Sequence, residues 1–229
     1  MKNRIHAVIF DCDGVIGDTE PLHLVARQIV YARYGFILTR EFYIEAMMSR
    51  SHEEQMRAAS CDPKHSEVIR SEVRNVYNLM RQELLREVPG AADCLRRFGG
   101  DFFLAVASTQ PRDVVVGVIG QAVGNALLHL FGRNIVSGED VPNNKPAPDV
   151  YLKTAELLGI APANCVAIED SVPGVKAAKA AGMRCIGFMG EFSTRQSLLG
   201  AGADIVAEGH HQINRETVES LSLGVVSYI

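Results

Sequence analysis

Val8-Ile9-Phe10-Asp11-Cys12-Asp13-Gly14-Val15 is the stretch that decides the fold, because an apolar run ends there in two carboxylates two residues apart. Apolar runs this short, closed by a turn residue, are typical of a strand buried on both faces. Asp11 and Asp13 are then expected just past the carboxyl end of that strand, where open α/β sheets bind their ligands. Gly14 would let the chain turn back sharply beside them.

The spacing of the two acids already carries a chemical implication. Carboxylates this close repel each other, which raises at least one pKa unless a cation lies between them. The stretch therefore indicates either a divalent-metal site or a nucleophile beside a proton donor. An isolated Asp-x-Asp-Gly fits a solvated acidic turn equally well, so the rest of the chain has to decide.

Composition narrows the function classes. The chain has 229 residues, of which 47% are hydrophobic and 22% charged, as in an ordinary globular protein. The net charge of −4 and the lack of a basic run in the sequence argue against a protein that binds nucleic acid. No apolar stretch approaches the roughly 20 residues of a membrane span. The first residues run directly into the first strand, so we expect no signal peptide. We expect a cytoplasmic protein that is a monomer or a weak homodimer. Five cysteines without regular spacing predict free, mostly buried thiols.

The order of helical and strand patterns predicts the architecture. Residues 17–88 are helical throughout, with start signals at Asp18-Thr19-Glu20-Pro21 and at Asp62-Pro63. From residue 89 on, helices alternate with strands, which we expect at 102–107, 134–136, 165–168, 184–188 and 204–207. This alternation predicts an α/β fold with a doubly wound parallel sheet. Residues 1–16 and 89–229 would form that core, and 17–88 a small all-helical cap domain inserted after the first strand.

Three later strands also end in polar residues. Ser108 and Thr109 follow the strand 102–107 and could donate to an anion, or simply begin a turn. Lys145 lies in a loop stiffened by two prolines, where it could hold a phosphate as a point charge, although a lone lysine is usually solvated. Glu169 and Asp170 close the strand 165–168. If these strand ends converge, up to four carboxylates share one cleft, which only a hard cation such as Mg²⁺ makes tolerable.

Taken in order, these residues match a family. Asp11-x-Asp13-Gly14-Val15, Ser108-Thr109, Lys145-Pro146 and Glu169-Asp170 resemble the four motifs of the haloacid dehalogenase-like phosphohydrolases. The helical insertion is similar to the small cap of their β-phosphoglucomutase-like branch. Each motif is weak alone, but four in order, each at an expected strand end, form a strong joint signal that covers essentially the whole chain.

The resemblance implies a Mg²⁺-dependent phosphatase that forms an aspartyl-phosphate intermediate. Asp11 would be the nucleophile, and Asp13 would protonate the leaving alcohol and then deprotonate the attacking water. Mg²⁺ would be held by Asp11, the backbone carbonyl of Asp13, and Asp170, with Glu169 a direct or water-mediated ligand. Ser108 and Lys145 would hold the phosphoryl oxygens.

The residues expected to contact substrate depart from those of the known mutases. The substrate-binding candidates are Gly14, Thr109, His23, Arg50, His52 and Arg112. The mutases follow the Ser108 position with Ser-Lys-Asn, whereas this chain has Gln110-Pro111-Arg112. Their cap loop Gly-Val-Ser-Arg is replaced by Ser49-Arg50-Ser51-His52, although His23 matches a mutase histidine. The cap side chains could also be merely solvated. We therefore expect hydrolysis of a small phosphorylated metabolite, a sugar phosphate or related organic phosphate, with a sugar-phosphate mutase as the alternative.

Three other classes fit less well. A 2-haloacid dehalogenase needs neither Asp13 as an acid nor the Glu169-Asp170 pair. A phospho-receiver module is about half this length and lacks a helical insertion. A catalytically dead relative is disfavoured because every catalytic position is filled. At the end of the chain, His210-His211 is expected to be a surface turn rather than a metal site.

Overall fold

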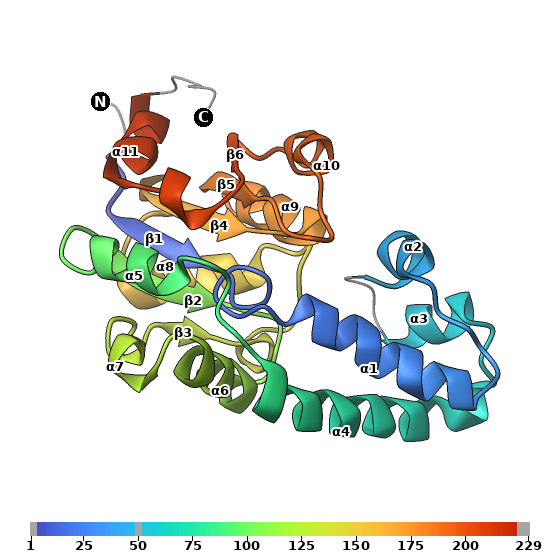
Figure 1. The fold of residues 1–229 in the computed structure, drawn as a ribbon. Coiled ribbons are helices and arrows are strands. Elements are labelled where there is room, and N and C mark those ends of the chain that lie inside the picture. The colour runs from blue at the N-terminus through green and yellow to red at the C-terminus, as the bar shows by residue number, and fades with distance from the viewer. Residues whose placement is uncertain (1–3, 49–51, 224–229) are drawn as a thin grey trace. The chain divides into compact units, whose positions relative to one another are not determined.

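The computed structural model describes residues 4–48 and 52–223, which divide into two compact units (Figure 1). Residues 1–17 and 86–229 form a core, and residues 18–85 form a helical unit. Gly17 and residues 86–88, which the sequence assigned to the cap, belong to the core. Gly17 pairs with Glu87 in an antiparallel bridge, and the Val88 N–H donates to the Ile16 carbonyl at 2.9 Å. These bonds tie the outgoing and returning chain together at the core side of the insertion.

The core is built on one six-stranded parallel sheet with the strand order β3-β2-β1-β4-β5-β6. The strands are β1 (Ala7–Phe10), β2 (Phe103–Ala107), β3 (Ile135–Val136), β4 (Cys165–Glu169), β5 (Arg184–Phe188) and β6 (Ile205–Ala207). The predicted α/β fold with a doubly wound sheet is therefore confirmed. β1, the strand of the opening motif, lies in the middle of the sheet and is completely buried, as its unbroken apolar run predicts.

Helices cover both faces of this sheet (Figure 1). They are α5 (Ala91–Phe98), α6 (Arg112–Ala122), α7 (Asn125–Leu128), α8 (Asp149–Leu158), α9 (Val172–Ala180), α10 (Arg195–Gly200) and α11 (Arg215–Leu223). Short 3₁₀ turns lie at Gly138–Asp140, Pro162–Asn164 and His210–Gln212. Alternate residues of β1 point to opposite faces, so Ile9 joins the apolar cluster formed with α8, α9 and α10. Phe10 instead contacts Phe98 of α5 and Phe131, with ring centroids 6.4 and 6.3 Å away.

The register of the three central strands explains where the site lies. Phe10 of β1 is opposite Val106 of β2 and Ile168 of β4. The next residue of each strand, namely Asp11, Ala107 or Glu169, therefore reaches the same level at the carboxyl edge of the sheet. The Asp11 N–H continues the ladder by donating to the Ile168 carbonyl at 3.0 Å.

The helical unit contains α1 (Glu20–Arg33), α2 (Arg40–Phe42), α3 (His52–Ala58) and α4 (Ser66–Leu84), with a π-helical turn at Tyr43–Met47 and a 3₁₀ turn at Pro63–His65. α1 and α4 pack against each other. Ile69 and Tyr77 of α4 are buried, whereas Leu84 at the end of the helix is exposed. The start signal at Asp62 is real, since its side chain accepts from the Lys64 N–H at 3.0 Å. Within the described ranges, no helix is long and apolar enough to cross a membrane.

His210 corrects one prediction for the end of the chain. Its side chain is buried rather than part of a surface turn, and its Nε2 lies 2.7 Å from the Val15 carbonyl oxygen. Arg97 donates to the His210 carbonyl at 2.7 Å, and the ring packs on Phe188 with centroids 4.6 Å apart. His211 is exposed, as expected. The sequence held no local signal for this, because Val15 lies 195 residues away.

Candidate active site

Asp11 lies at the carboxyl end of β1, where only 7% of the residue is exposed. Lys145, in the loop between β3 and α8, donates from Nζ to Asp11 Oδ1 at 2.6 Å and to the Ala107 carbonyl at 2.9 Å. The same Nζ lies 2.6 Å from Glu169 Oε1. The ammonium group thus has an acceptor for each of its three protons. The lysine of the proline-stiffened loop is therefore a buried member of an ion-pair network.

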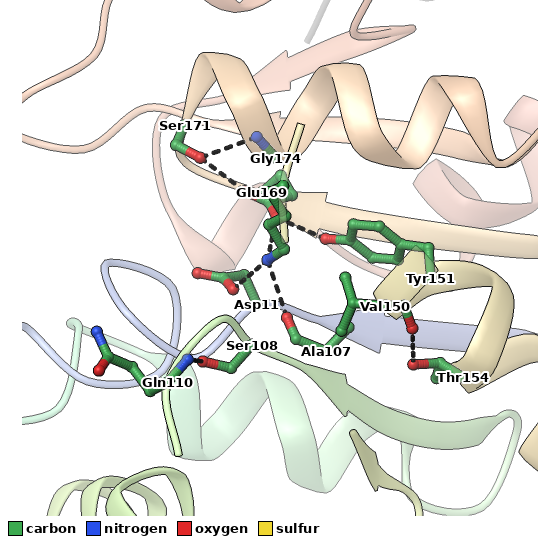
Figure 2. Close-up of polar contacts among 11 residues, drawn as sticks. Asp11, Ala107, Ser108, Gln110, Val150, Tyr151, Thr154, Glu169, Ser171 and Gly174 are labelled. Carbon is green, nitrogen blue, oxygen red and sulfur yellow. Dashed lines mark hydrogen bonds and ion pairs between the residues drawn. The ribbon is translucent and has the colours of Figure 1, made fainter. Parts of the chain in front are cut away.

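Glu169 is the last residue of β4 and is completely buried. Besides Lys145, Oε1 accepts from the Tyr151 hydroxyl at 2.6 Å, and Oε2 accepts from Ser171 Oγ at 3.2 Å (Figure 2). Gly174, in the first turn of α9, makes room for the carboxylate, since a Cβ there would lie only 1.8–2.2 Å from its atoms. A buried charge is tolerated only when it is paired and hydrogen-bonded, and Glu169 meets both conditions.

Asp170 brings a third carboxylate to this edge. One oxygen each of Asp11, Glu169 and Asp170 lie within 4.8 Å of one another. Gly14 lies directly against Asp170, because a Cβ on Gly14 would be 2.0 Å from Asp170 Oδ2, and its φ of +70° also suits glycine. Three converging carboxylates are the hard oxygen donors that Mg²⁺ prefers, so the residues present fit that ion. The strand ends that the sequence expected to converge do so.

Burial and neighbouring charges shift the pKa values of the groups in this cluster. Burial raises the pKa of Asp11 to about 8, the nearby Lys145 ammonium opposes that rise, and the negative charge of Glu169 adds to it. Asp11 and Glu169 raise the pKa of Lys145, although burial alone would lower it, so the lysine keeps its proton. Burial also raises the pKa of Tyr151 well above its ordinary value, which keeps its hydroxyl a donor. Asp11 thus needs positive charge beyond Lys145 to be fully ionised near neutral pH.

The other two core motifs lie at neighbouring positions of the same edge. Ser108, fully buried after β2, donates its N–H to the Val136 carbonyl at 3.0 Å. Its Oγ accepts from the Gln110 N–H at 3.1 Å, which leaves the hydroxyl proton available for another acceptor. Thr109 is exposed, and its carbonyl lies so close to Gly138 that a Cβ there would come within 2.3 Å. Asp13 is half-buried in the turn after β1, where it forms a bridge with Gly17.

Arg112 has a partner within the core. It begins α6 and forms an ion pair with Asp140 at 2.9 Å, while Asp140 also accepts from the Ser137 N–H and hydroxyl, both at 2.8 Å. The Arg112 side chain is 47% exposed. The sequence predicted a cation here but not its ion pair with Asp140.

The remaining substrate-binding candidates belong to the helical unit. His23 stacks on Tyr77, with ring centroids 4.1 Å apart and planes 2° from parallel. Its Nε2 has no hydrogen-bond partner in the described part of the chain, and burial lowers its pKa to about 3, with Arg27 contributing in the same direction. His52 Nε2 lies 2.8 Å from the Ser66 carbonyl oxygen. Arg50 falls outside the described residues.

Sequence reasoning missed Tyr151 and Ser171. The available signal for Tyr151 was a tyrosine among apolar residues of a helix, because a buried tyrosine hydroxyl usually requires a hydrogen-bond partner. Ser171 was visible only as the residue before α9, whose side chain also accepts from the Gly174 N–H at 3.1 Å as a helix cap.

Comparison with known proteins agrees with this geometry. Residues 8–188 match the family model described as haloacid dehalogenase-like hydrolase. The chain belongs to the haloacid dehalogenase-like hydrolases. That match extends across the insertion and all four motifs.

Relatives in this hydrolase family include several phosphatases. The phosphorylated carbohydrates phosphatase of Thermotoga maritima is 30% identical over 218 residues, covering 92% of this chain and 97% of that protein. The fructose-1-phosphate phosphatase YqaB of Escherichia coli is 29% identical, and the match covers 81% of this chain and 97% of that protein. The crystal structure of CbbY from Rhodobacter sphaeroides in complex with phosphate has a TM-score of 0.77 at 27% identity, covering 94% of this chain and 99% of that one. Together with the family match, these relatives show that this chain is a phosphoric monoester hydrolase.

Proposed function

We propose that the protein is a Mg²⁺-dependent phosphatase of small phosphorylated carbohydrates and that it works through a phosphorylated Asp11. The observation that carries the proposal is the buried Asp11 beside Lys145, with the carboxylates of Glu169 and Asp170 at the same edge. A carboxylate hydrogen-bonded to a fixed cation at the end of a central strand is an oriented nucleophile.

In the first half-reaction, an Asp11 oxygen attacks phosphorus and the bond to the leaving alcohol breaks. Asp13, half-buried two residues on, donates a proton to the leaving oxygen. In the second half-reaction, the Asp13 carboxylate takes a proton from water, whose oxygen attacks phosphorus. The bond to Asp11 then breaks, which restores its carboxylate and releases inorganic phosphate.

The other core residues stabilise the phosphoryl oxygens. Ser108 has a hydroxyl proton to donate, because its oxygen already accepts from Gln110. Lys145 is saturated by three acceptors, so a phosphoryl oxygen must replace one of them. Its contact with Asp11 is the natural one to exchange, since that carboxylate loses its charge when phosphorylated. The backbone N–H groups near Gly14 complete the cradle.

A metal ion fits the donor set. Asp11, Asp170, the carbonyl of Asp13, and Glu169 directly or through water, would hold Mg²⁺. The bound ion would supply positive charge that keeps Asp11 ionised and offsets the charge of the phosphoryl group. Burial raises the pKa of Asp11 in spite of the nearby Lys145 ammonium, which supports this requirement.

Substrate choice is assigned to a smaller set of residues. Relatives named as phosphatases of phosphorylated carbohydrates and of fructose 1-phosphate support a phosphorylated sugar or sugar alcohol. We propose that His23, Arg50 and His52 of the helical unit, and Thr109 of the core, contribute to substrate choice. Arg112 contributes less than its charge suggests, because Asp140 already neutralises it.

The decisive experiment compares wild type with Asp11→Asn on fructose 1-phosphate and related sugar phosphates, with Mg²⁺ and with excess chelator. The variant should lose at least about 10³-fold in kcat, as expected when a covalent nucleophile is removed. Asp113→Asn, an exposed acid on α6, is the matched control and should retain full activity. Undiminished turnover of Asp11→Asn, or of wild type in chelator, would overturn the proposal.

The mutase alternative needs its own measurement. β-glucose 1-phosphate is supplied with a catalytic trace of the 1,6-bisphosphate, and both inorganic phosphate and glucose 6-phosphate are followed. Multiple-turnover release of phosphate is expected. Rapid formation of glucose 6-phosphate with negligible phosphate release would assign the chain to the mutases.

A further inference from the structure

Tyr151 is a buried residue of α8 that none of the proposed chemical steps uses. It is 0% exposed and belongs to the apolar cluster beneath the sheet, so it does not touch substrate. Its hydroxyl nevertheless donates to Glu169 Oε1 at 2.6 Å (Figure 2). Its ring centroid lies 5.2 Å from Lys145 Nζ. One side chain thus contacts both charged neighbours of the Asp11 site.

Glu169 depends on these contacts for its orientation. Lys145 and Tyr151 share Oε1 as acceptor, while Ser171 holds Oε2 at the longer distance of 3.2 Å. Gly174 lies directly against the carboxylate but offers it no side chain, so the hydrogen-bond donors set how the carboxylate is rotated about its last bond. Tyr151 belongs to α8, which packs against the sheet. Its short hydrogen bond therefore fixes the orientation of the Glu169 carboxylate.

Lys145 depends on Glu169 in turn. Its Nζ lies between Asp11 Oδ1 and Glu169 Oε1, each 2.6 Å away. If the Glu169 carboxylate shifts, the ammonium group either follows it away from Asp11 or loses its contact with Glu169. The ring of Tyr151 further limits where the cation can move, because ammonium groups are attracted to the faces of aromatic rings.

We infer that Tyr151 is a positioning residue, which sets the orientation of Glu169 and through it the place of the Lys145 charge beside Asp11. This inference rests on the proposed function, since it concerns the same site. Outer residues that orient ligands and charged groups typically contribute about 10–100-fold to activity or metal affinity.

Tyr151→Phe tests the hydroxyl while it keeps the ring and the packing. The matched control is Thr154→Val on the same helix, which removes a buried hydroxyl that donates to the Val150 carbonyl at 2.7 Å. Tyr151→Phe should lower kcat about 10–100-fold with KM nearly unchanged, and should weaken binding of Mn²⁺ to the protein alone, followed by electron paramagnetic resonance, by a similar factor. Thr154→Val should change neither quantity, although it also costs stability.

A double-mutant cycle with Glu169→Gln tests whether Tyr151 acts through that carboxylate. In the Glu169→Gln background, Tyr151→Phe should have little further effect on kcat. If Tyr151→Phe does not fold, Tyr151→Met, which fills much of the same volume without a hydroxyl, takes its place. Wild-type kcat and Mn²⁺ affinity in the folded variant, or fully additive effects in the cycle, would overturn the inference. A wild-type protein without phosphatase activity would instead overturn the proposed function.

Discussion

The core and the helical unit hold their polar side chains in different ways. In the core, Lys145 and Glu169 are 6% and 0% exposed, and each is fixed by several partners. In the helical unit, the ion pair of Arg33 with Glu72 leaves the two side chains 57% and 32% exposed, so solvent competes for both. Buried, multiply bonded groups cannot rearrange without leaving a charge unpaired, whereas exposed pairs exchange partners at little cost.

On the proposed function, this difference would separate chemistry from recognition. The core holds Asp11, Lys145 and Glu169 in fixed positions, which suits phosphoryl transfer through an oriented nucleophile. Polar groups on helix faces can adapt to different leaving groups. If that division is correct, small changes in the core should have large effects, and changes at exposed ion pairs should have small ones.

Among the changes that test this comparison, Gly174→Ala in the core should have the largest effect. A Cβ at this position would lie 1.8–2.2 Å from the Glu169 carboxylate, which must then move away from Lys145 and Tyr151. We expect kcat to fall at least about tenfold and the free energy of unfolding to fall by about 1–3 kcal/mol. Steady-state kinetics and urea denaturation measure both.

Gly200→Ala provides the matched control, because Gly200 ends α10 with open space around it. That substitution should leave kcat unchanged and leave stability unchanged or higher by up to about 1 kcal/mol. An active and stable Gly174→Ala protein would mean that the Glu169 carboxylate is free to shift, which would break the contrast between the two regions.

An intermediate effect is expected from a change of pH on the free energy of unfolding. Two histidines carry it, His210 in the core and His23 in the helical unit. Burial lowers the pKa of His210 to about 4 and the pKa of His23 to about 3, both from 6.5. Each ring is neutral in the folded protein but binds a proton in the unfolded chain below pH 6.5. Each therefore contributes stability that is present above pH 6.5 and is lost as pH falls toward the folded pKa. Between pH 7.5 and 5, the loss should be about 2 kcal/mol for each residue.

Urea denaturation across that pH range measures the slope for His210→Phe, for His23→Phe and for His129→Phe, an exposed control. The first two variants should flatten the pH dependence and the control should not. Only His210→Phe should also cost about 1–3 kcal/mol at pH 7.5, because the Val15 carbonyl loses its partner while His23 Nε2 has none to lose. Equal costs at pH 7.5 would contradict this distinction.

The smallest effect is expected from Arg112→Met. The ion pair of Arg112 with Asp140 leaves the two side chains 47% and 33% exposed, so its loss should lower the free energy of unfolding by less than about 1 kcal/mol. Arg96→Met removes an exposed pair with Asp93 elsewhere in the core and should behave alike. A rise in KM above about tenfold, seen only for Arg112→Met, would show that this cation binds substrate in spite of Asp140.

The sequence by itself determined the architecture and indicated which strand-end residues lie together at the carboxyl edge of the sheet. Apolar runs that end in Asp11, Ser108 and Glu169 predicted buried parallel strands, and the common edge of such strands predicted that their polar residues converge. These inferences succeed because periodicity and strand-end chemistry are local properties of the chain. Gly124, whose φ of +90° no helix accommodates, separates α6 from α7, and only the structure located this break.

Only the tertiary structure decided which partner each polar side chain has. Tyr151 meets Glu169 across 18 positions, Lys145 meets Asp11 across 134, and His210 meets Val15 across 195. Such pairs depend on strand register and on how helices pack over the sheet, and neither is encoded in the residues next to them. For the same reason, a histidine that looked exposed is buried, and a free cation at Arg112 has a carboxylate partner.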